Sequence, residues 1–205
     1  MPQITQGIRS ILSIPAIYSL FGVLIGGSSW RTTFVKEYVC PKFGDRILDI
    51  GCGPGDIFPY LPKVEYVGCD LSQKYIEAAL TRFGDRATFI CRKVSATTLE
   101  KYSSFDIVLA VGILHHLDDA EALQLFCLAQ AALKPGGRLV TFDGVFVANQ
   151  SPCARYIISK DRGQNVRTKE GYLSIASQVF SNIVVNIRHD LLRIPYTHII
   201  LECSR

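Results

Sequence analysis

The sequence lacks several features that would assign it to a common class of protein. It has no internal repeat, no low-complexity tract and no pair of cysteines spaced as CxxC. Its seven cysteines are an odd number and several lie in apolar runs, which indicates free thiols in a reducing compartment and disfavours zinc. Its 22 basic and 18 acidic residues are spread along the chain, whereas nucleic-acid binding usually needs a clustered basic face. We therefore expect a cytoplasmic protein with no metal and no nucleic-acid partner.

The chain also lacks an uninterrupted apolar run of the roughly 20 residues that span a bilayer. The stretch ILSIPAIYSLFGVLI (11–25) follows Arg9 and looks like a signal-peptide core, but it is too short to span and Pro15 interrupts it. We expect a retained helical segment that packs over the domain, rather than a signal or a membrane anchor. The alternatives are that it joins two copies of the chain or touches a membrane, so a monomer and a homodimer both stay open.

What the chain does have is enough apolar sequence for one full domain. Its 205 residues are 48% hydrophobic and 20% charged, which argues against disorder. We expect residues 1–36 to form an apolar helical cap or lid, and residues 37–205 to form a catalytic α/β core.

From residue 45 onward, short apolar strands alternate with helical patterns. The patterns predict strands at 46–50, 65–69, 87–91, 105–111 and 138–142. After a helix near 168–180, strands at 182–188 and 197–203 follow each other without a helix between them, so we expect an antiparallel pair at one sheet edge. The alternation indicates a doubly wound, mostly parallel sheet, whose ligands bind at the carboxyl ends of the strands. Residues 144–167 show no clear period.

Two helices have clear signals at their ends. The first is expected to begin at the cap Ser72 and to stop at Gly84; the second is expected to begin at Asp118 and Asp119 and to stop at Lys134–Gly137. The apolar faces that we expect to be buried comprise Tyr75, Ile76, Ala79, Leu80 and Phe83 in the first helix, and Ala122, Leu125, Phe126, Ala129 and Leu133 in the second.

Three glycines follow the first predicted strand in the stretch ILDIGCGPGD (47–56). Gly51, Gly53 and Gly55 allow positive φ angles and carry no Cβ, so a ligand can lie against the backbone. Asp70 comes 19 residues after Gly51 at the end of the second strand, where its carboxylate can accept hydrogen bonds from both hydroxyls of a ribose. This pairing favours a cofactor that contains adenosine over a turn that is merely rich in glycine.

The acidic residues around this loop discriminate between adenosine cofactors. In the dinucleotide fingerprint G-x-G-x-x-G, the third glycine lies beneath a pyrophosphate, and here Asp56 takes that position. A carboxylate there would repel a pyrophosphate, and Asp49 adds a second acid just before the loop. Two acids suit a positively charged ligand. S-Adenosylmethionine carries adenosine, a sulfonium and an ammonium but no phosphate, so the charges favour it over NAD.

At these motifs the sequence resembles the class I S-adenosylmethionine-dependent methyltransferases. The resemblance is carried by ILDIGCGPG, GCDLS, FDIVLAVGILHHLDD and LKPGGRLV, and covers roughly residues 40–145. It implies a Rossmann-like, seven-stranded sheet in the order 3-2-1-4-5-7-6 with an antiparallel last strand. It also implies a cofactor site made by Asp49, Gly51, Cys52, Gly53, Asp70, Leu71, Val94, Ser95, Val111 and Gly112.

Within that implied site, Asp49 and the glycines would lie along the methionine part of the cofactor, and Leu71 would lie beside the adenine. Many members of the family place an acid after the third strand to receive the adenine amino group. This sequence departs from the pattern, because the matching region is CRKVSA. The backbone of Val94 or the hydroxyl of Ser95 would take the place of the acid.

The stretch HHLDD places His115 and His116 just past the fourth strand, at the expected mouth of the cleft. Methyl transfer is an in-line displacement that needs a base only where the acceptor is protonated, as in a phenol of pKa about 10. By resemblance to methyltransferases with a histidine in this loop, His116 is the better candidate catalytic base, followed by His115. The alternative is that both histidines only shape the loop.

Acceptor contacts are expected near the carboxyl end of the fifth strand, in segment 155–167 and at the last hairpin. The arginines of this segment, including Arg167, would with Asp161 suit an anionic acceptor such as a carboxylate or phosphate, unless they form a salt-bridged surface loop. The residues that we expect to bind substrate are Asp143, Arg155, Arg162 and Tyr196. Edge packing is the alternative for Tyr196.

The sequence has no Asn/Asp-Pro-Pro-aromatic motif and shows no added domain for protein or tRNA. With an apolar segment as lid, these features favour a methyltransferase acting on a small, partly hydrophobic molecule. The alternatives are an NAD-dependent oxidoreductase, transfer from a carboxylated or decarboxylated relative of the cofactor, and a non-catalytic binding module. Asp49 favours the intact amino-acid end of S-adenosylmethionine over a decarboxylated one.

Overall fold

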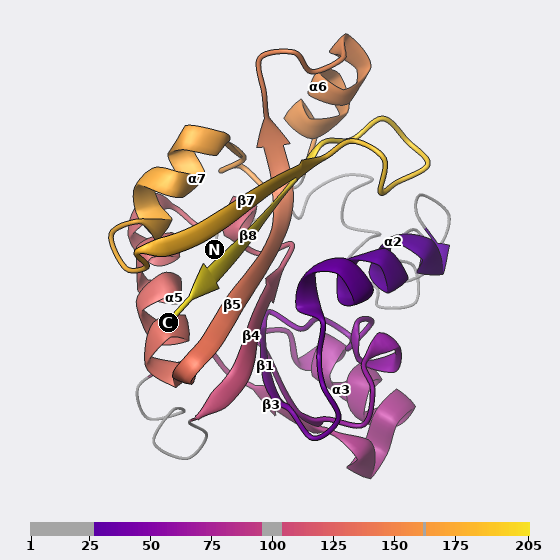
Figure 1. The fold of residues 1–205 in the computed structure, drawn as a ribbon. Helices are drawn as coiled ribbons and strands as arrows, with labels where there is room; N and C mark the ends of the chain where they lie inside the picture. Colours follow the sequence, from indigo (N-terminus) through magenta and orange to yellow (C-terminus); the bar gives the residue numbers. More distant parts are fainter. Residues whose placement is uncertain (1–26, 96–103, 162) are drawn as a thin grey trace.

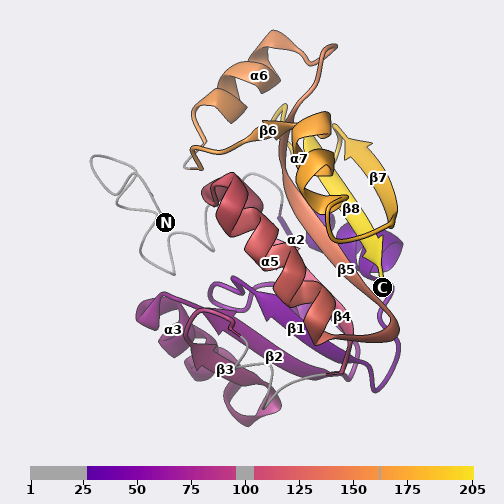
Figure 2. The ribbon, with the colours of Figure 1, turned by 90° about the vertical axis from the view of Figure 1, so that its left-hand side faces the viewer.

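The computed structural model describes residues 27–95, 104–161 and 163–205. One eight-stranded sheet runs through this part of the chain, with helices on both of its faces (Figure 1). The helices α5 (Asp119–Ala132) and α7 (Lys169–Ala176) cover one face, whereas α2 (Gly27–Phe34) and α3 (Gln73–Phe83) cover the other, as Figure 2 shows from the side. The sheet therefore separates two hydrophobic cores, as expected of a doubly wound fold.

The strand order is β3-β2-β1-β4-β5-β8-β7, and the short β6 pairs with β5 outside this path. The first five strands are parallel, and β8 runs antiparallel to both β5 and β7. The strands are β1 (Arg46–Ile50), β2 (Glu65–Asp70), β3 (Thr88–Cys91), β4 (Phe105–Val111), β5 (Leu133–Phe146), β6 (Arg167–Thr168), β7 (Asn182–Arg188) and β8 (His198–Ser204). The predicted order is confirmed, while the count of seven strands missed the two-residue β6.

The strand β5 begins earlier than the sequence predicted. The KPGG stretch was expected to end the preceding helix, but Leu133 already pairs with Phe105, and the register shifts between Phe105 and Ile107. Leu133 is buried and is the carboxyl-terminal cap of α5 rather than a member of its helical stripe. The helix α5 thus ends where the strand β5 begins.

The caps of α3 and α5 form as predicted. Ser72 Oγ accepts from the Tyr75 N–H at 3.4 Å, and Asp118 Oδ1 accepts from the Glu121 N–H at 2.8 Å. The Glu121 carboxylate accepts in turn from the Asp118 N–H, which completes a capping box. One expectation for α3 is wrong: Leu80 is 45% exposed, because it lies outside the face that packs on the sheet.

A further helix, α6 (Pro152–Ser159), lies in the segment where the sequence showed no period. Ser151 caps it and Pro152 stands at its first turn, which is a recognised start signal. The shorter turns are η3 (Phe58–Tyr60), η4 (Gly84–Arg86), η5 (Leu114–His116) and the π-helical η2 (Val35–Val39).

The predicted apolar segment 11–25 lies outside the described residues, but α2 continues the same end of the chain. Trp30 stacks on Phe142 with ring centroids 4.7 Å apart, and Phe34 meets the same ring edge-on. This anchors α2 over β5. Among the residues that the structure describes, no helix reaches the length and apolar character that crossing a bilayer requires. All seven cysteines are free thiols, as expected.

Candidate cofactor and acceptor site

Two glycines of the turn after β1 differ in what surrounds them. At Gly51, φ is +77°, a left-handed backbone that favours glycine, and a Cβ there would lie 2.6 Å from Ile113 Cδ1, so the end of that side chain would have to shift. At Gly53, φ is +54°, and a Cβ there would have no described atom within 4 Å. Gly51 is therefore favoured by its own backbone conformation and by its contact with Ile113, whereas Gly53 leaves open space in which a ligand can approach the backbone.

The carboxylate of Asp70 is held at this turn by two main-chain donors. Its Oδ2 accepts from the Gly53 N–H at 3.0 Å, and its Oδ1 accepts from the Ser72 N–H at 2.7 Å. Burial raises the pKa of Asp70, and these hydrogen bonds oppose the rise. Because a carboxylate oxygen can accept more than one hydrogen bond, both oxygens keep capacity for the hydroxyls of a ribose.

Asp49 lies deeper, on β1, and is only 2% exposed. Its Oδ2 accepts from Tyr66 Oη at 2.6 Å, while its Oδ1 is buried without a hydrogen-bond partner among the described residues. Burial raises the pKa of Asp49 to about 7, although the hydrogen bond from Tyr66 acts in the opposite direction. Sequence reasoning missed Tyr66; the only available signal was a hydroxyl within the buried strand EYVGC.

Asp56 does not have the role that the sequence argument gave it. Its carboxylate accepts from Arg82 at 2.5 Å and pairs with Arg31 at 3.4 Å, so two cations compensate its charge. The electrostatic preference for a cationic ligand therefore depends on Asp49 rather than on two acids. Arg31 comes from α2, so this ion pair also ties the N-terminal helix to the glycine turn.

The other residues expected around the cofactor lie at the same edge of the sheet. Gly112 has φ of +66° and donates to the Phe142 carbonyl at 2.7 Å, which joins the end of β4 to β5. Leu71 is 53% exposed, which leaves an apolar surface for a base to cover, whereas Val94 is buried. Val111 and Ser95 are partly buried, and Cys52 is a buried thiol whose pKa is raised by burial.

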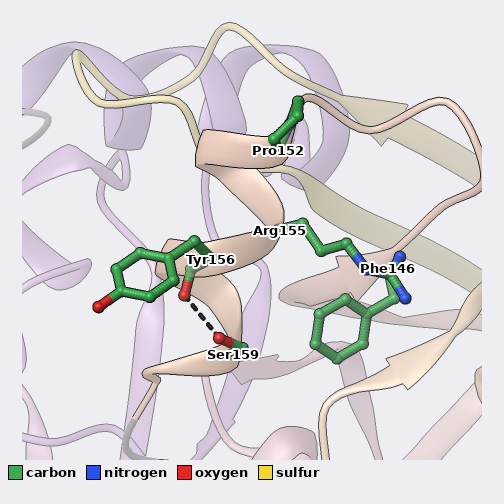
Figure 3. Close-up of a pocket in the computed structure, with 5 residues that line it drawn as sticks. All are labelled: Phe146, Pro152, Arg155, Tyr156 and Ser159. Carbon is green, nitrogen blue, oxygen red and sulfur yellow. Dashed lines mark hydrogen bonds between the residues drawn. The ribbon is translucent and has the colours of Figure 1, made fainter.

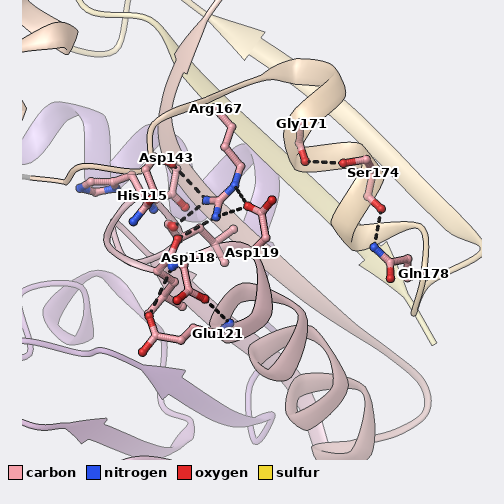
Figure 4. Close-up of polar contacts among 12 residues, drawn as sticks. His115, Asp118, Asp119, Glu121, Asp143, Arg167, Gly171, Ser174 and Gln178 are labelled. Atoms are coloured by element: carbon pink, nitrogen blue, oxygen red, sulfur yellow. Dashed lines mark hydrogen bonds and ion pairs between the residues drawn. The ribbon is translucent and has the colours of Figure 1, made fainter. Parts of the chain in front are cut away.

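His115 lies in a buried ionic network, and Figure 4 shows it together with one of its partners, Asp143. Its Nδ1 lies 2.7 Å from Asp143 Oδ1, and its Nε2 lies 3.3 Å from Asp161 Oδ1. Burial alone would lower the pKa of His115, but the hydrogen bonds and charges of the two aspartates raise it to about 10. His115 is therefore a cation at neutral pH.

The third member of this network, Asp161, is fixed by further donors. Tyr196 Oη donates to its Oδ2 at 2.6 Å, and the Gly163 N–H donates to its Oδ1 at 3.0 Å. Burial favours protonation, yet His115 and these donors hold the pKa of Asp161 well below its usual range. Two expected acceptor residues, Asp143 and Tyr196, thus both belong to the His115 network, and Asp143 is fully buried.

Arg167 holds neighbouring segments of the chain together and is not exposed to bind an anion. Its guanidinium donates to the carbonyls of Leu114, Leu117 and Asn165, and pairs with Asp119 at 2.8 Å (Figure 4). A Cβ on Gly163 would collide with the His115 ring, so this segment lies directly on the loop after β4. Of the two interpretations of Arg167, the salt-bridged one is correct.

His116 follows His115 in η5, partly buried, and the two rings lie 4.1 Å apart between centroids. A row of rings extends along the same edge of the sheet. His198 lies between Phe142 at 4.4 Å and Tyr196 at 4.7 Å, and Phe142 is also the ring on which Trp30 stacks. Burial lowers the pKa of His198 to about 3, so this ring is neutral and aromatic in character.

Arg155 belongs to a separate hollow beside α6 (Figure 3). Its guanidinium carbon lies 5.3 Å from the centre of the Phe146 ring, and Ser159 Oγ donates to the Tyr156 carbonyl at 2.7 Å. The hollow has a volume of about 430 Å³ and is lined by Phe146, Pro152, Arg155, Tyr156 and Ser159. Arg162 lies outside the described residues. In the described part of the chain, no group of three acidic, histidine or cysteine side chains is placed to hold a metal.

Together, the glycine turn, the acid at the end of β2 and the topology give a doubly wound α/β fold whose strands β1, β2 and β4 end at one edge of the sheet. Comparison with known proteins supports the class of protein that the sequence resembles. Residues 47–137 match the model of a family described as a methyltransferase domain. This match covers somewhat less than half of the chain, and it supports the resemblance to the class I S-adenosylmethionine-dependent methyltransferases.

Among curated relatives, phosphoethanolamine N-methyltransferase 1 of Arabidopsis thaliana is 28% identical over 187 residues, covering 88% of this chain and 37% of the relative. A ubiquinone biosynthesis O-methyltransferase of Idiomarina loihiensis is 27% identical over 114 residues, covering 53% of this chain and 46% of the relative. The chain thus spans less than half the length of these two relatives.

Among solved structures, phosphoethanolamine N-methyltransferase 2 of Haemonchus contortus is similar to this chain with a TM-score of 0.71 at 19% identity. The match covers 96% of this chain and 58% of that chain, whose structure holds phosphomonomethylethanolamine and S-adenosylhomocysteine. At this level of identity, the similarity shows a common fold.

Proposed function

We propose that this chain is an S-adenosylmethionine-dependent methyltransferase that acts on a small, partly hydrophobic molecule by in-line methyl transfer. The observation that best supports it is Asp49 Oδ1, a buried carboxylate oxygen at the glycine turn with no partner among the described residues. An ammonium group supplies the missing cation, whereas the pyrophosphate of NAD would bring like charge to this place.

The proposal assigns a residue of this site to each part of the cofactor. Asp49 would accept a hydrogen bond from the ammonium, and Gly53 would leave room for the methionine part of the cofactor. Asp70 would accept hydrogen bonds from the ribose hydroxyls. Leu71 would cover the adenine, whose amino group would meet the backbone of Val94 or the hydroxyl of Ser95. When bound, the cofactor supplies a methyl group on sulfur and a neutral thioether as leaving group.

The two histidines have different parts in this proposal. His115 is held protonated between two aspartates, so at neutral pH it has no capacity to accept a proton from an acceptor. We assign it the positioning of His116, whose ring lies beside it at a tilt of 40°. His116 is then the candidate general base, for an acceptor that is protonated at neutral pH.

The acceptor is proposed to lie along the ring-lined edge of the sheet, with aromatic surface from Trp30, Phe142 and Tyr196. Residues 1–36 would close this edge as a cap, in line with the packing of α2 on β5. Arg155 and Arg162 remain candidates for an anionic part of the acceptor. The two N-methyltransferase relatives, named for phosphoethanolamine, and the relative named for ubiquinone biosynthesis also suggest small acceptors. We further propose a cytoplasmic monomer or homodimer with no nucleic-acid partner.

A ligand screen by thermal shift, followed by calorimetry, tests this function. We expect S-adenosylmethionine and S-adenosylhomocysteine to raise the melting temperature and NAD to leave it unchanged. Asp70→Ala should weaken the binding of S-adenosylhomocysteine by more than about tenfold, because each lost hydrogen bond to a charged group costs about 1.5–3 kcal/mol. Asp85→Ala, an exposed acid in η4, is the matched control.

Stabilisation by NAD alone would support the oxidoreductase alternative. Tight binding of S-adenosylmethionine without methyl transfer to any tested amine, phenol or carboxylate would support a non-catalytic module. His116→Ala tests the base: it should remove the neutral-pH limb of the kcat/KM profile, and an unchanged limb would exclude the assignment.

A further inference from the structure

The hydrogen bond between Tyr66 and Asp49 joins two fully buried side chains on neighbouring strands. Tyr66 is 2% exposed and donates its hydroxyl to Asp49 Oδ2 at 2.6 Å. This fixes the rotation of the carboxylate and directs its other oxygen, Oδ1, to a place where the described chain offers no donor. Tyr66 therefore determines which oxygen of Asp49 stays available.

The groups that shift the pKa of Asp49 include no cation among the described residues. The helix α2 packs on the same face of the sheet and brings Arg31, but this guanidinium pairs with Asp56. The titratable groups that face it are Tyr66, Cys69 and Asp70 from β2, and Cys52 from the glycine turn. On β4 its partner in the parallel ladder is the apolar Leu109. A carboxylate in such a place is stable as an anion only when a ligand brings positive charge, and otherwise it tends to bind a proton.

We propose that Asp49 exchanges a proton for the cofactor's ammonium group, and that Tyr66 is the positioning residue that holds Asp49 for this exchange. In the free chain a fraction of Asp49 carries a proton on its carboxyl group. When the ammonium reaches Oδ1, that proton passes to the solvent and the carboxylate stays hydrogen-bonded to Tyr66. The inference rests on the proposed function, because it requires a cofactor with an amino-acid end.

A pKa of about 7 for Asp49 in the free chain sets the expected size of the effect. If bound Asp49 is fully ionised, the dissociation constant should be about tenfold higher at pH 6 than at pH 8. The same linkage predicts release of about 0.9 proton per ligand at pH 6, about 0.5 at pH 7 and about 0.1 at pH 8.

Calorimetry with S-adenosylhomocysteine tests the exchange on the full chain without any turnover. Titrations at pH 6, 7 and 8, each in phosphate and in imidazole, give the number of protons released from the difference in heat between the buffers. 5′-Methylthioadenosine is the matched ligand, because it keeps the adenosine but has neither ammonium nor carboxylate. It should bind with no proton release from Asp49 and with nearly constant affinity over this range.

Tyr66→Phe tests the positioning role. A hydrogen bond to a charged group is worth at least about a tenfold change in equilibrium constant, so its loss should move the midpoint of the pH dependence up by about one unit. The variant should bind S-adenosylhomocysteine about tenfold more weakly than the wild type at pH 6, and almost equally at pH 8.5. Tyr172→Phe, which removes another buried hydroxyl bonded to the Gly144 carbonyl, should leave the midpoint unchanged.

The outcomes separate this inference from the proposed function. Binding of S-adenosylhomocysteine with no proton release and constant affinity would overturn the exchange and leave the methyltransferase proposal intact. A loss in Tyr66→Phe that is equal at every pH would reduce Tyr66 to a structural residue and overturn its assignment. Failure of the wild type to bind S-adenosylhomocysteine at any pH would overturn both.

Discussion

Alanine at Gly53 tests the position of the cofactor against a control within the same chain. Gly53 and Gly44 both have positive φ, +54° and +84°, and a Cβ on either meets no described atom within 4 Å. Gly53 lies after the carboxyl end of β1, whereas Gly44 lies before its amino end. The two substitutions therefore impose a similar backbone strain at opposite edges of the sheet.

The strain in each variant can be estimated from its φ value. Holding a non-glycine residue in the left-handed region costs about 1–2 kcal/mol. For a chain of this size, each 1 kcal/mol lowers the melting temperature by about 2–4 °C, so both variants should lose about 2–8 °C. Only the Cβ at Gly53 would project into the cofactor, and overpacking of one methyl group costs about 1–3 kcal/mol, or about 5- to 150-fold in affinity.

Thermal unfolding and calorimetry with S-adenosylhomocysteine measure the two effects separately. We expect similar melting temperatures for Gly53→Ala and Gly44→Ala, with weakened binding in Gly53→Ala alone. Wild-type affinity in Gly53→Ala would refute the placement of the cofactor on the glycine turn. An equal loss of affinity in Gly44→Ala would show that the effect comes from strain rather than from contact.

Three further predictions concern the hydrogen bonds and ion pairs around the site. The pKa of His115 is about 10 in the folded chain against about 6.5 in a free histidine, so the stability it contributes is complete below pH 6.5 and is lost as the pH rises through 10. In urea titrations between these pH values, the free energy of unfolding should fall less steeply with pH for His115→Gln than for the wild type. Identical slopes for variant and wild type would contradict the network. Arg167→Ala should lower the free energy of unfolding by about 1.5–3 kcal/mol, since the side chain is 10% exposed and donates to three main-chain carbonyls. A loss below about 0.5 kcal/mol in the same titration would show that the contacts of Arg167 do not stabilise the fold as predicted. Asp118→Ala should cost about 1 kcal/mol through the lost cap of α5, whereas Asp118→Asn should keep nearly all of the stability, and equal losses would argue against the cap.

The strands of the sheet were predictable because their signals are local. β1 and β4 occupy the ranges that their apolar runs indicated, and the caps Ser72 and Asp118 start helices as their residue types suggest. The end of α5 was not predictable, because the pairing of Leu133 with Phe105 depends on a strand far away in the chain. Tertiary pairing there overrides the stop signal of the KPGG stretch.

The candidate site, too, was predictable from local signals but not in its long-range contacts. The positions of Asp49, Gly51 and Asp70 follow from the spacing of one strand-turn-strand unit, and the structure brings them to one edge. The partners of charged side chains do not follow from spacing. Asp56 is compensated by arginines 25 and 26 residues away, and Asp143 meets His115 across 28 residues. Only the folded chain shows which acids are already paired.

The most direct test of the central claim is a crystal structure of the chain soaked with S-adenosylhomocysteine, with a parallel soak in NADH. The account predicts the ribose hydroxyls on Asp70 and the ammonium within hydrogen-bond distance of Asp49 Oδ1. NADH with its pyrophosphate on the glycine turn, or a crevice left empty by S-adenosylhomocysteine at millimolar concentration, would contradict it.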